Sequence, residues 1–336
     1  MSKLLSRKVL VPTVIAVVAL AIINLFRIPG AILPEISVAA EPVFELFGFP
    51  ITNTLLASWL TMIVLIVGLG AITRKRKPVP GRWQSALEMI IDGLYKLTEG
   101  AAGSKWGRRF FPIVMTIFLF VLVSNWLGLT PLFGAWGPLH HSAEGHEVQW
   151  LNESQTVGKL VRSAEGHEEA GEAAPEGERY VLVGMFRPAT TDLNVTIALA
   201  IVSVVLTQYF GVKGRGLGYF GKFIAVGGIV RAFTKPGLGC GGRIAAFFMG
   251  IIDVFIGMVE LISEIGKIIS FSFRLFGNIF AGEVLLAVMA FMITIVISLP
   301  FYGLEIFVGF VQALVFMMLT VAFFVVAMSG HGEEEH

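Results

Sequence analysis

Six long apolar segments constrain the fold of this sequence more than any other feature. They cover residues 9–27, 53–72, 110–130, 192–212, about 246–297, and 300–328. A helix of about 20 apolar residues crosses a hydrocarbon core of about 30 Å. Only 15% of the residues are charged, against about 25% in a typical soluble protein. The sequence therefore predicts an all-α polytopic membrane protein.

Net charge and cysteine content narrow the possible functions. The formal net charge is +1, which implies no general attraction to nucleic acid. Cys240 is the only cysteine, which excludes an intrachain disulfide framework and gives no cysteine cluster for a metal. We therefore expect no nucleic-acid partner, no metal and no cofactor.

The N-terminus has the layout of a signal peptide or a first membrane anchor. Lys3, Arg7 and Lys8 precede the first apolar segment. That segment is longer than a usual signal core, and the nearest small-residue cleavage site, at 38–40, lies well downstream. This favours an uncleaved anchor over residues 1–30, followed by one membrane domain over residues 31–336.

The distribution of basic residues predicts the topology. Segments 73–109 and 213–245 are rich in lysine and arginine, and the second contains no acidic residue. Segment 134–191 is instead rich in glutamate. Because cytoplasmic loops carry the excess of basic residues, the first two segments are expected in the cytoplasm and 134–191 outside. Both chain ends are then cytoplasmic, in a plasma (inner) membrane of bacterial type.

Two segments between the spans differ from them in character. Segment 82–101 places its apolar residues on one helical face and is too polar to span, which predicts an amphipathic surface helix. Segment 138–187 is polar and glutamate-rich, and contains His140, His141, His146 and His167. Because these histidines lack regular helical spacing, a solvated, partly disordered loop is favoured over a metal site.

The last two apolar segments are longer than a bilayer requires. About fifty helical residues extend about 75 Å at 1.5 Å per residue, so helices of this length must tilt, kink or lie partly along the membrane. Ser298 and Pro300 mark a turn between them. The sequence thus predicts a long, strongly tilted C-terminal hairpin.

Charged and amide side chains interrupt this hairpin. Each charge costs at least about 2.5–3.5 kcal/mol at the centre of a membrane helix, so such groups face protein or water and usually mark ion pathways. At 100° per residue, with Arg274 as zero, Lys267 falls at about 20° and Glu283 at about 180°. A polar stripe therefore ends at Arg274, with a carboxylate on the opposite face beyond it. The other members of the stripe are Asp253, Glu260, Glu264 and Asn278, while Glu305 and Gln312 share a face of the partner helix.

Two interpretations of the stripe remain open from the residues alone. Glu260, Glu264 and Lys267 have spacings at which they can simply neutralise one another, or they can line a pathway. Arg274 is different, because positions 270, 271, 277 and 278 hold no acid. Its counter-charge must come from another helix or another chain.

Residues 272–283, SFRLFGNIFAGE, resemble the signature of subunit a of rotary ATP synthases. Glu260 and Lys267 stand fourteen and seven residues before the arginine, as in that family. Segments 48–54, 125–131, 192–196 and 312–320 also resemble the family, so the likeness covers roughly residues 42–328. Segments 1–30 and 138–187 fall outside it. Position 305 holds glutamate where some members carry histidine, and both side chains can relay a proton.

The resemblance implies a non-catalytic subunit that forms the stator half of a proton channel. Its partners would be the c-ring proteolipid subunits, the peripheral-stalk b subunits and the rest of the ATP synthase. Ring carboxylates would lose their protons on meeting Arg274, which stays charged and separates two offset half-channels. Glu283 and Glu305 would relay protons in the outer half-channel beside Gln312 and Asn278. The cytoplasmic exit would hold Glu260, Glu264 and Lys267.

Two other classes of function fit the sequence less well. A secondary transporter could bind an anionic substrate at Arg274, but no inverted repeat or pair of broken helices is visible in the sequence. A membrane-embedded hydrolase requires a nucleophile or a metal pair within the spans. The spans contain no Ser/His pair and no His/Glu metal motif.

Overall fold

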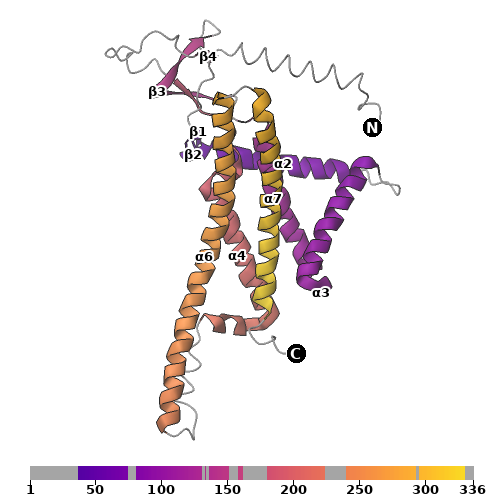
Figure 1. Cartoon of the computed structure of the whole chain (residues 1–336), viewed down its shortest axis with the longest axis vertical. Coiled ribbons are helices and arrows are strands. Elements are labelled where there is room, and N and C mark those ends of the chain that lie inside the picture. Colours follow the sequence, from indigo (N-terminus) through magenta and orange to yellow (C-terminus); the bar gives the residue numbers. More distant parts are fainter. Residues whose placement is uncertain are drawn as a thin grey trace. The chain divides into compact units, whose positions relative to one another are not determined.

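The computed structural model describes residues 37–74, 81–130, 133, 136–150, 158–161, 180–223, 240–292 and 295–329. Five long helices dominate these residues (Figure 1). They are α2 (Asn53–Arg74), α3 (Arg82–Gly128), α4 (Leu193–Arg215), α6 (Cys240–Met292) and α7 (Ile295–Met328). The predicted N-terminal anchor lies outside the described residues.

All five helices are long and apolar enough to cross a membrane. The predicted class, a mainly helical polytopic membrane protein, is therefore confirmed. The helix α6 has 53 residues, which corresponds to about 80 Å at 1.5 Å per residue. Its tilt relative to a bilayer stays a prediction. Pro300 lies inside α7 and not between the two helices, because α7 already begins at Ile295. Near the start of a helix, a proline disturbs only the first turns.

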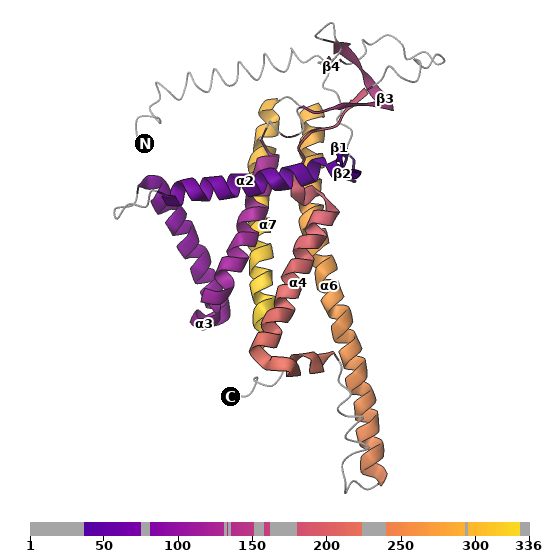
Figure 2. The same cartoon turned by 180° about the vertical axis from the view of Figure 1, so that it is seen from behind.

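The helix α3 contains two segments for which the sequence predicts separate elements. It joins the amphipathic segment 82–101 to the apolar segment 110–130. Gly103 interrupts the helical geometry with φ 73° and ψ 164°, a conformation open to glycine because it has no Cβ. The ring centroids of Tyr95 and Phe111 lie 5.3 Å apart across this break. The two halves of α3 therefore fold back toward each other (Figure 2).

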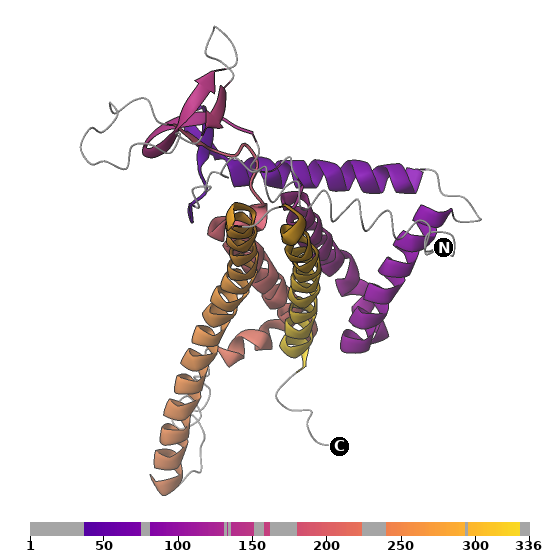
Figure 3. The ribbon, with the colours of Figure 1, turned by 45° about the horizontal axis from the view of Figure 1, so that its top comes forward.

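Short strands precede α2 and lie between α3 and α4. Strands β1 (Pro42–Leu46) and β2 (Phe49–Thr52) form an antiparallel hairpin. Its turn contains Phe47 and Gly48, both with positive φ. Strand β3 (Leu139–Trp150) pairs with β4 (Gly158–Val161) and β5 (Tyr180–Leu182), as Figure 3 shows.

Parts of the segment 138–187, which was expected to be an irregular loop, form the strands β3, β4 and β5. The strand β3 contains His140, His141 and His146. A polar sequence interrupted by glycine can form a strand when neighbouring strands satisfy its backbone hydrogen-bonding groups. The strand β3 lies between β4 and β5 and pairs with both. His167 lies outside the described residues.

The chain divides into two compact units. The first comprises residues 1–61, 123–192 and 278–310, and the second comprises residues 62–122, 193–277 and 311–336. The boundaries fall within α2, α3, α6 and α7 and directly before α4. Each unit therefore contains parts of the helices that carry the candidate site residues.

The second unit has an aromatic core. Phe110 of α3, Phe210 of α4 and Phe324 of α7 have ring centroids 4.8–5.1 Å apart. The ring centroid of Phe271 of α6 lies 4.9 Å from that of Phe316 and 5.1 Å from that of Phe323, both on α7. Such ring pairs stabilise a core beyond the apolar area they bury. They hold α3, α4, α6 and α7 together within this unit.

Candidate functional site

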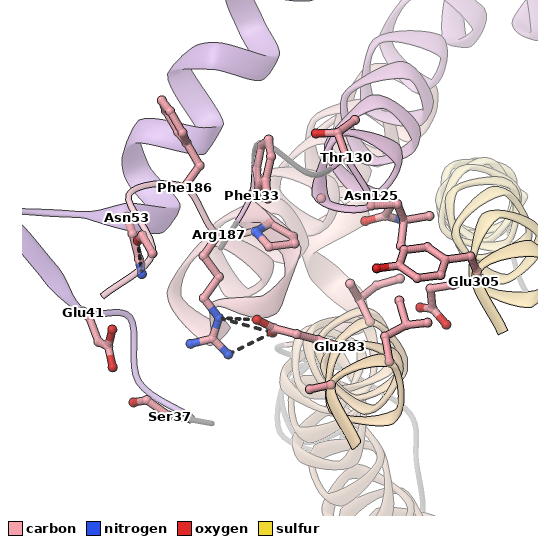
Figure 4. Close-up of a pocket in the computed structure, with 18 of the residues that line it drawn as sticks. Ser37, Glu41, Asn53, Asn125, Thr130, Phe133, Phe186, Arg187, Glu283 and Glu305 are labelled. Carbon is pink, nitrogen blue, oxygen red and sulfur yellow. Dashed lines mark hydrogen bonds and ion pairs between the residues drawn. The ribbon is translucent and has the colours of Figure 1, made fainter. Parts of the chain in front are cut away.

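The first unit contains a cavity of about 500 Å³ that opens between α6, α7 and the segments before α2 and α4. We call it the carboxylate pocket, because Glu283 of α6 and Glu305 of α7 both line it. Figure 4 shows the two carboxylates on neighbouring helices, with Arg187 reaching one of them from the segment before α4. The structure thus brings together two residues that the sequence assigned to one pathway.

Arg187 forms the principal ion pair of the pocket. Its Nε donates to both carboxylate oxygens of Glu283 at 3.2 Å, and its Nη2 donates to Oε2 at 3.0 Å. Its Nη1 donates to the carbonyl of Ala39 at 3.2 Å, and its guanidinium lies 5.7 Å from the ring centroid of Phe280. Such fork-shaped contacts hold both the position and the charge of a carboxylate. The side chains of Arg187 and Glu283 are 10% and 34% exposed.

Glu305 has a different environment in the same pocket. It is 7% exposed, and its Oε1 has no hydrogen-bond partner among the residues that the structure describes. Its carboxylate lies against Gly282, so closely that a Cβ on Gly282 would collide with it. The glycine therefore provides the space that Glu305 occupies.

Buried polar contacts hold the walls of the pocket. The hydroxyl of Thr54, at the start of α2, donates to Asp192 Oδ2 at 2.8 Å, directly before α4. The hydroxyl of Thr190 donates to Asn125 Oδ1 at 2.6 Å, and Asn125 donates to the carbonyl of Gly309 at 3.2 Å. Because buried polar groups are costly without partners, these contacts fix one arrangement of the segment before α4 and the parts of α2, α3 and α7 that belong to the first unit.

The second unit contains a separate group of charges, which we call the lysine cluster: Lys222, Lys267, Glu260 and Glu264. Glu264 Oε1 accepts from Lys222 at 3.0 Å and from Lys267 at 2.9 Å. Lys222 also donates to Glu260 at 3.2 Å. The pairing of Glu264 with Lys267 that the sequence left open is therefore confirmed. The cluster is electrically balanced, with two cations and two anions.

Lys222 enters the cluster from the short helix η2 (Gly216–Lys222), which follows α4. Its Nζ lies 4.4 Å from the ring centroid of buried Tyr219 and 4.5 Å from that of Phe223. Burial alone lowers the pKa of Lys222, but hydrogen bonds with Tyr219 and Glu264 and the charge of Glu264 raise it above the usual value. Lys222 is therefore a fixed cation at neutral pH.

The remaining predicted site residues lie outside these two groups. Arg274 is exposed, and across the described parts of the chain its hydrogen bond is a long 3.4 Å contact with Ser270 Oγ. Asn278 is exposed on α6 and Gln312 is half-buried on α7. An exposed arginine in an apolar helix agrees with the expectation that its counter-charge comes from elsewhere.

Arg187 and Lys222 are site residues that the sequence reasoning missed. Arg187 is separated by 96 positions from Glu283, and Lys222 by 38 and 42 positions from Glu260 and Glu264. Each had a weak signal: a basic residue close to a predicted span, with no acid at helical spacing. Both lie in segments whose charged residues were used only to predict the membrane topology.

Comparison with known proteins identifies the family. The family model of the ATP synthase A chain matches residues 55–325. The chain is also 27% identical over 289 residues to ATP synthase subunit a of Moorella thermoacetica. The aligned region covers 86% of this chain and 96% of that protein. The family match extends over parts of all five long helices. The chain therefore belongs to the ATP synthase A chain family, and is an integral membrane protein with a role in proton conduction through the membrane sector of an ATP synthase.

Proposed function

We propose that this chain is the stator half of the proton channel, with two offset half-channels that lead to and from the carboxylates of a rotating c ring. The observation that carries the proposal is the carboxylate pocket. Glu283 and Glu305, from different helices, line one cavity of about 500 Å³. A space of this size holds water, and a proton path requires an acid that borders such a space.

The carboxylate pocket forms the outer half-channel, with Gln312 and Asn278 as hydrogen-bonding neighbours of the path. The lysine cluster forms the cytoplasmic exit. Glu260 is its more accessible acid, with a side chain 32% exposed against 7% for Glu264. Glu264 accepts hydrogen bonds from two lysines and is buried, so Glu260 is the acid of the cluster that water can reach more easily.

Arg274 separates the two half-channels. A ring carboxylate is neutral while it faces lipid, because an ion in hydrocarbon is strongly disfavoured. On meeting Arg274 its charged form is stabilised, and it releases the proton. The exposed side chain of Arg274 on α6 is consistent with a partner that belongs to another chain. Peripheral-stalk b subunits would hold this chain still while the ring turns.

Replacing Gly282 with alanine tests the assignment of Glu305 to the path. The new methyl group must displace the Glu305 carboxylate, which lies at the end of a flexible side chain. We expect normal assembly, because alanine favours the helix by about 1 kcal/mol over glycine, and proton conduction several-fold slower. Gly303→Ala is the matched control, since nothing lies within 4 Å of a Cβ there. Equal conduction by both variants would contradict the role of Glu305.

Sidedness is tested by single cysteines in a Cys240→Ser background. Ser37 lines the carboxylate pocket, and Gly218 lies exposed on η2 beside the lysine cluster. An impermeant thiol reagent should label Ser37→Cys only from outside and Gly218→Cys only from the cytoplasm, in right-side-out and inverted vesicles. Labelling of both positions from one side would overturn the two-sided path.

A further inference from the structure

The two acids of the carboxylate pocket differ in their surroundings, which indicates different roles. Building on the proposed function, we propose that Arg187 holds Glu283 in a fixed ion pair and that Glu305 is the acid of the pocket that exchanges protons. Arg187 is then a positioning residue, because it acts through Glu283 and does not itself carry a proton.

The contacts of Glu283 are those of a fixed ion. Three nitrogen–oxygen contacts of 3.0–3.2 Å join it to Arg187, and both of its oxygens accept. A guanidinium stays charged at all relevant pH values and cannot accept a proton from its partner. Protonating Glu283 would remove the anion and leave a largely buried cation, which is strongly unfavourable. Proton exchange at Glu283 would therefore have to break this pair at every step.

Arg187 is itself held from a third direction. Its Nη1 donates to the carbonyl of Ala39, and the ring of Phe280 lies beneath the guanidinium. Arg187 therefore cannot readily turn away and release Glu283. The Arg187–Glu283 pair has almost no net charge. The other groups that line the pocket therefore set its electrostatic potential.

Glu305 has the properties that proton exchange requires. No donor in the described parts of the chain reaches its Oε1, and the carboxylate faces the same cavity. The other titratable groups that line the pocket are Glu41 and Tyr302. Neither is a cation, so Arg187 is the only positive side chain among the lining residues, and Glu283 already neutralises it. A proton can thus move on and off Glu305 without breaking an ion pair.

This division of roles predicts an asymmetric double-variant result. Glu283→Gln leaves Arg187 as an uncompensated cation that repels protons from the pocket, and Arg187→Gln leaves an uncompensated second anion. Each single variant should slow proton uptake about tenfold, the scale of coupling between paired charges. The variant Arg187→Gln/Glu283→Gln removes both charges, and it should recover to within about threefold of the wild type. Glu305→Gln should not be rescued by Arg187→Gln.

The experiment measures passive proton uptake in vesicles that contain the assembled ATP synthase stripped of its catalytic head, with assembly checked by the amount of bound ring. The pH dependence of uptake is recorded for each variant. The double variant should keep the midpoint of the wild type, since Glu305 sets it, and an unrelated structural rescue would not preserve it. Glu45→Gln, an exposed acid on β1, is the matched control for loss of one carboxylate.

The outcomes separate this inference from the function beneath it. If the assembled double variant is as slow as Glu283→Gln, Glu283 carries protons itself and the division of roles is wrong. If the double variant does not assemble, the charge-reversed pair Arg187→Glu/Glu283→Arg replaces it. If the charge-reversed variant takes up protons faster than Glu283→Gln does, the result supports a fixed ion pair. If its uptake is no faster, the division of roles is overturned. Wild-type uptake in both Glu283→Gln and Glu305→Gln would instead remove the outer half-channel from this pocket.

Discussion

ATP synthesis should fall by at least about 100-fold when Arg274 is replaced by lysine, the scale on which one preorganised charge-stabilising donor acts. The formal charge is retained, but the guanidinium fork that can hold a passing carboxylate with two parallel hydrogen bonds is lost. Lysine can also lose its proton when desolvated, whereas arginine cannot. Because Arg274 is exposed on α6 and makes one long contact with Ser270, the change should not disturb the fold.

Arg274→Ala should also abolish synthesis, yet differ in one respect. Without the cation, a protonated ring carboxylate can pass the boundary between the half-channels, so head-stripped vesicles should still conduct protons passively. Synthesis is measured in energised vesicles and passive uptake in stripped ones, with Arg215→Lys at the exposed end of α4 as the control. Normal synthesis by the lysine variant contradicts the separator role. Loss of passive uptake in an assembled alanine variant makes Arg274 an obligatory part of the path.

The helices could be predicted from the sequence because each apolar segment carries its own signal. The predicted segment 53–72 corresponds to α2 (Asn53–Arg74), and 192–212 corresponds to α4 (Leu193–Arg215). Membrane depth demands a continuous run of apolar residues, so the pattern needs no knowledge of neighbouring helices. The start of α7 was misplaced because a proline ends many helices, but it is tolerated in the first turns.

The acids of the candidate site could also be found from the sequence, while their partners could not. A charge inside an apolar segment is costly wherever the helix packs, so Glu283 and Glu305 stand out without a structure. Arg187 and Lys222 lie outside the long spans, where a basic residue costs little and therefore gives only a weak signal. Their roles depend on which helix lies opposite, which is a property of the tertiary fold. The strand β3 was missed for the same reason, since its pairing partners supply its stability.

Glu305→Gln should reduce proton conduction by about 100-fold, the lower range of what a positioned proton-transfer group contributes. Glutamine fills the space beside Gly282 but has no proton to exchange. Assembly should therefore be preserved, which quantifying the assembled complex in the same vesicles verifies. The complex should bind its catalytic head and hydrolyse ATP without pumping. Wild-type pumping by this variant would contradict a proton-carrying role for Glu305.

Glu305→His distinguishes a proton relay from a carboxylate needed only for its charge or shape. Imidazole exchanges one proton as a carboxyl group does, so this variant should retain a measurable part of the conduction that Glu305→Gln loses. The two groups have different pKa values, so the pH–conduction profile of Glu305→His should have a different midpoint from that of the wild type. If the histidine variant is as inactive as the glutamine variant at every pH, a negative charge and not an exchangeable proton is what the path requires at this position.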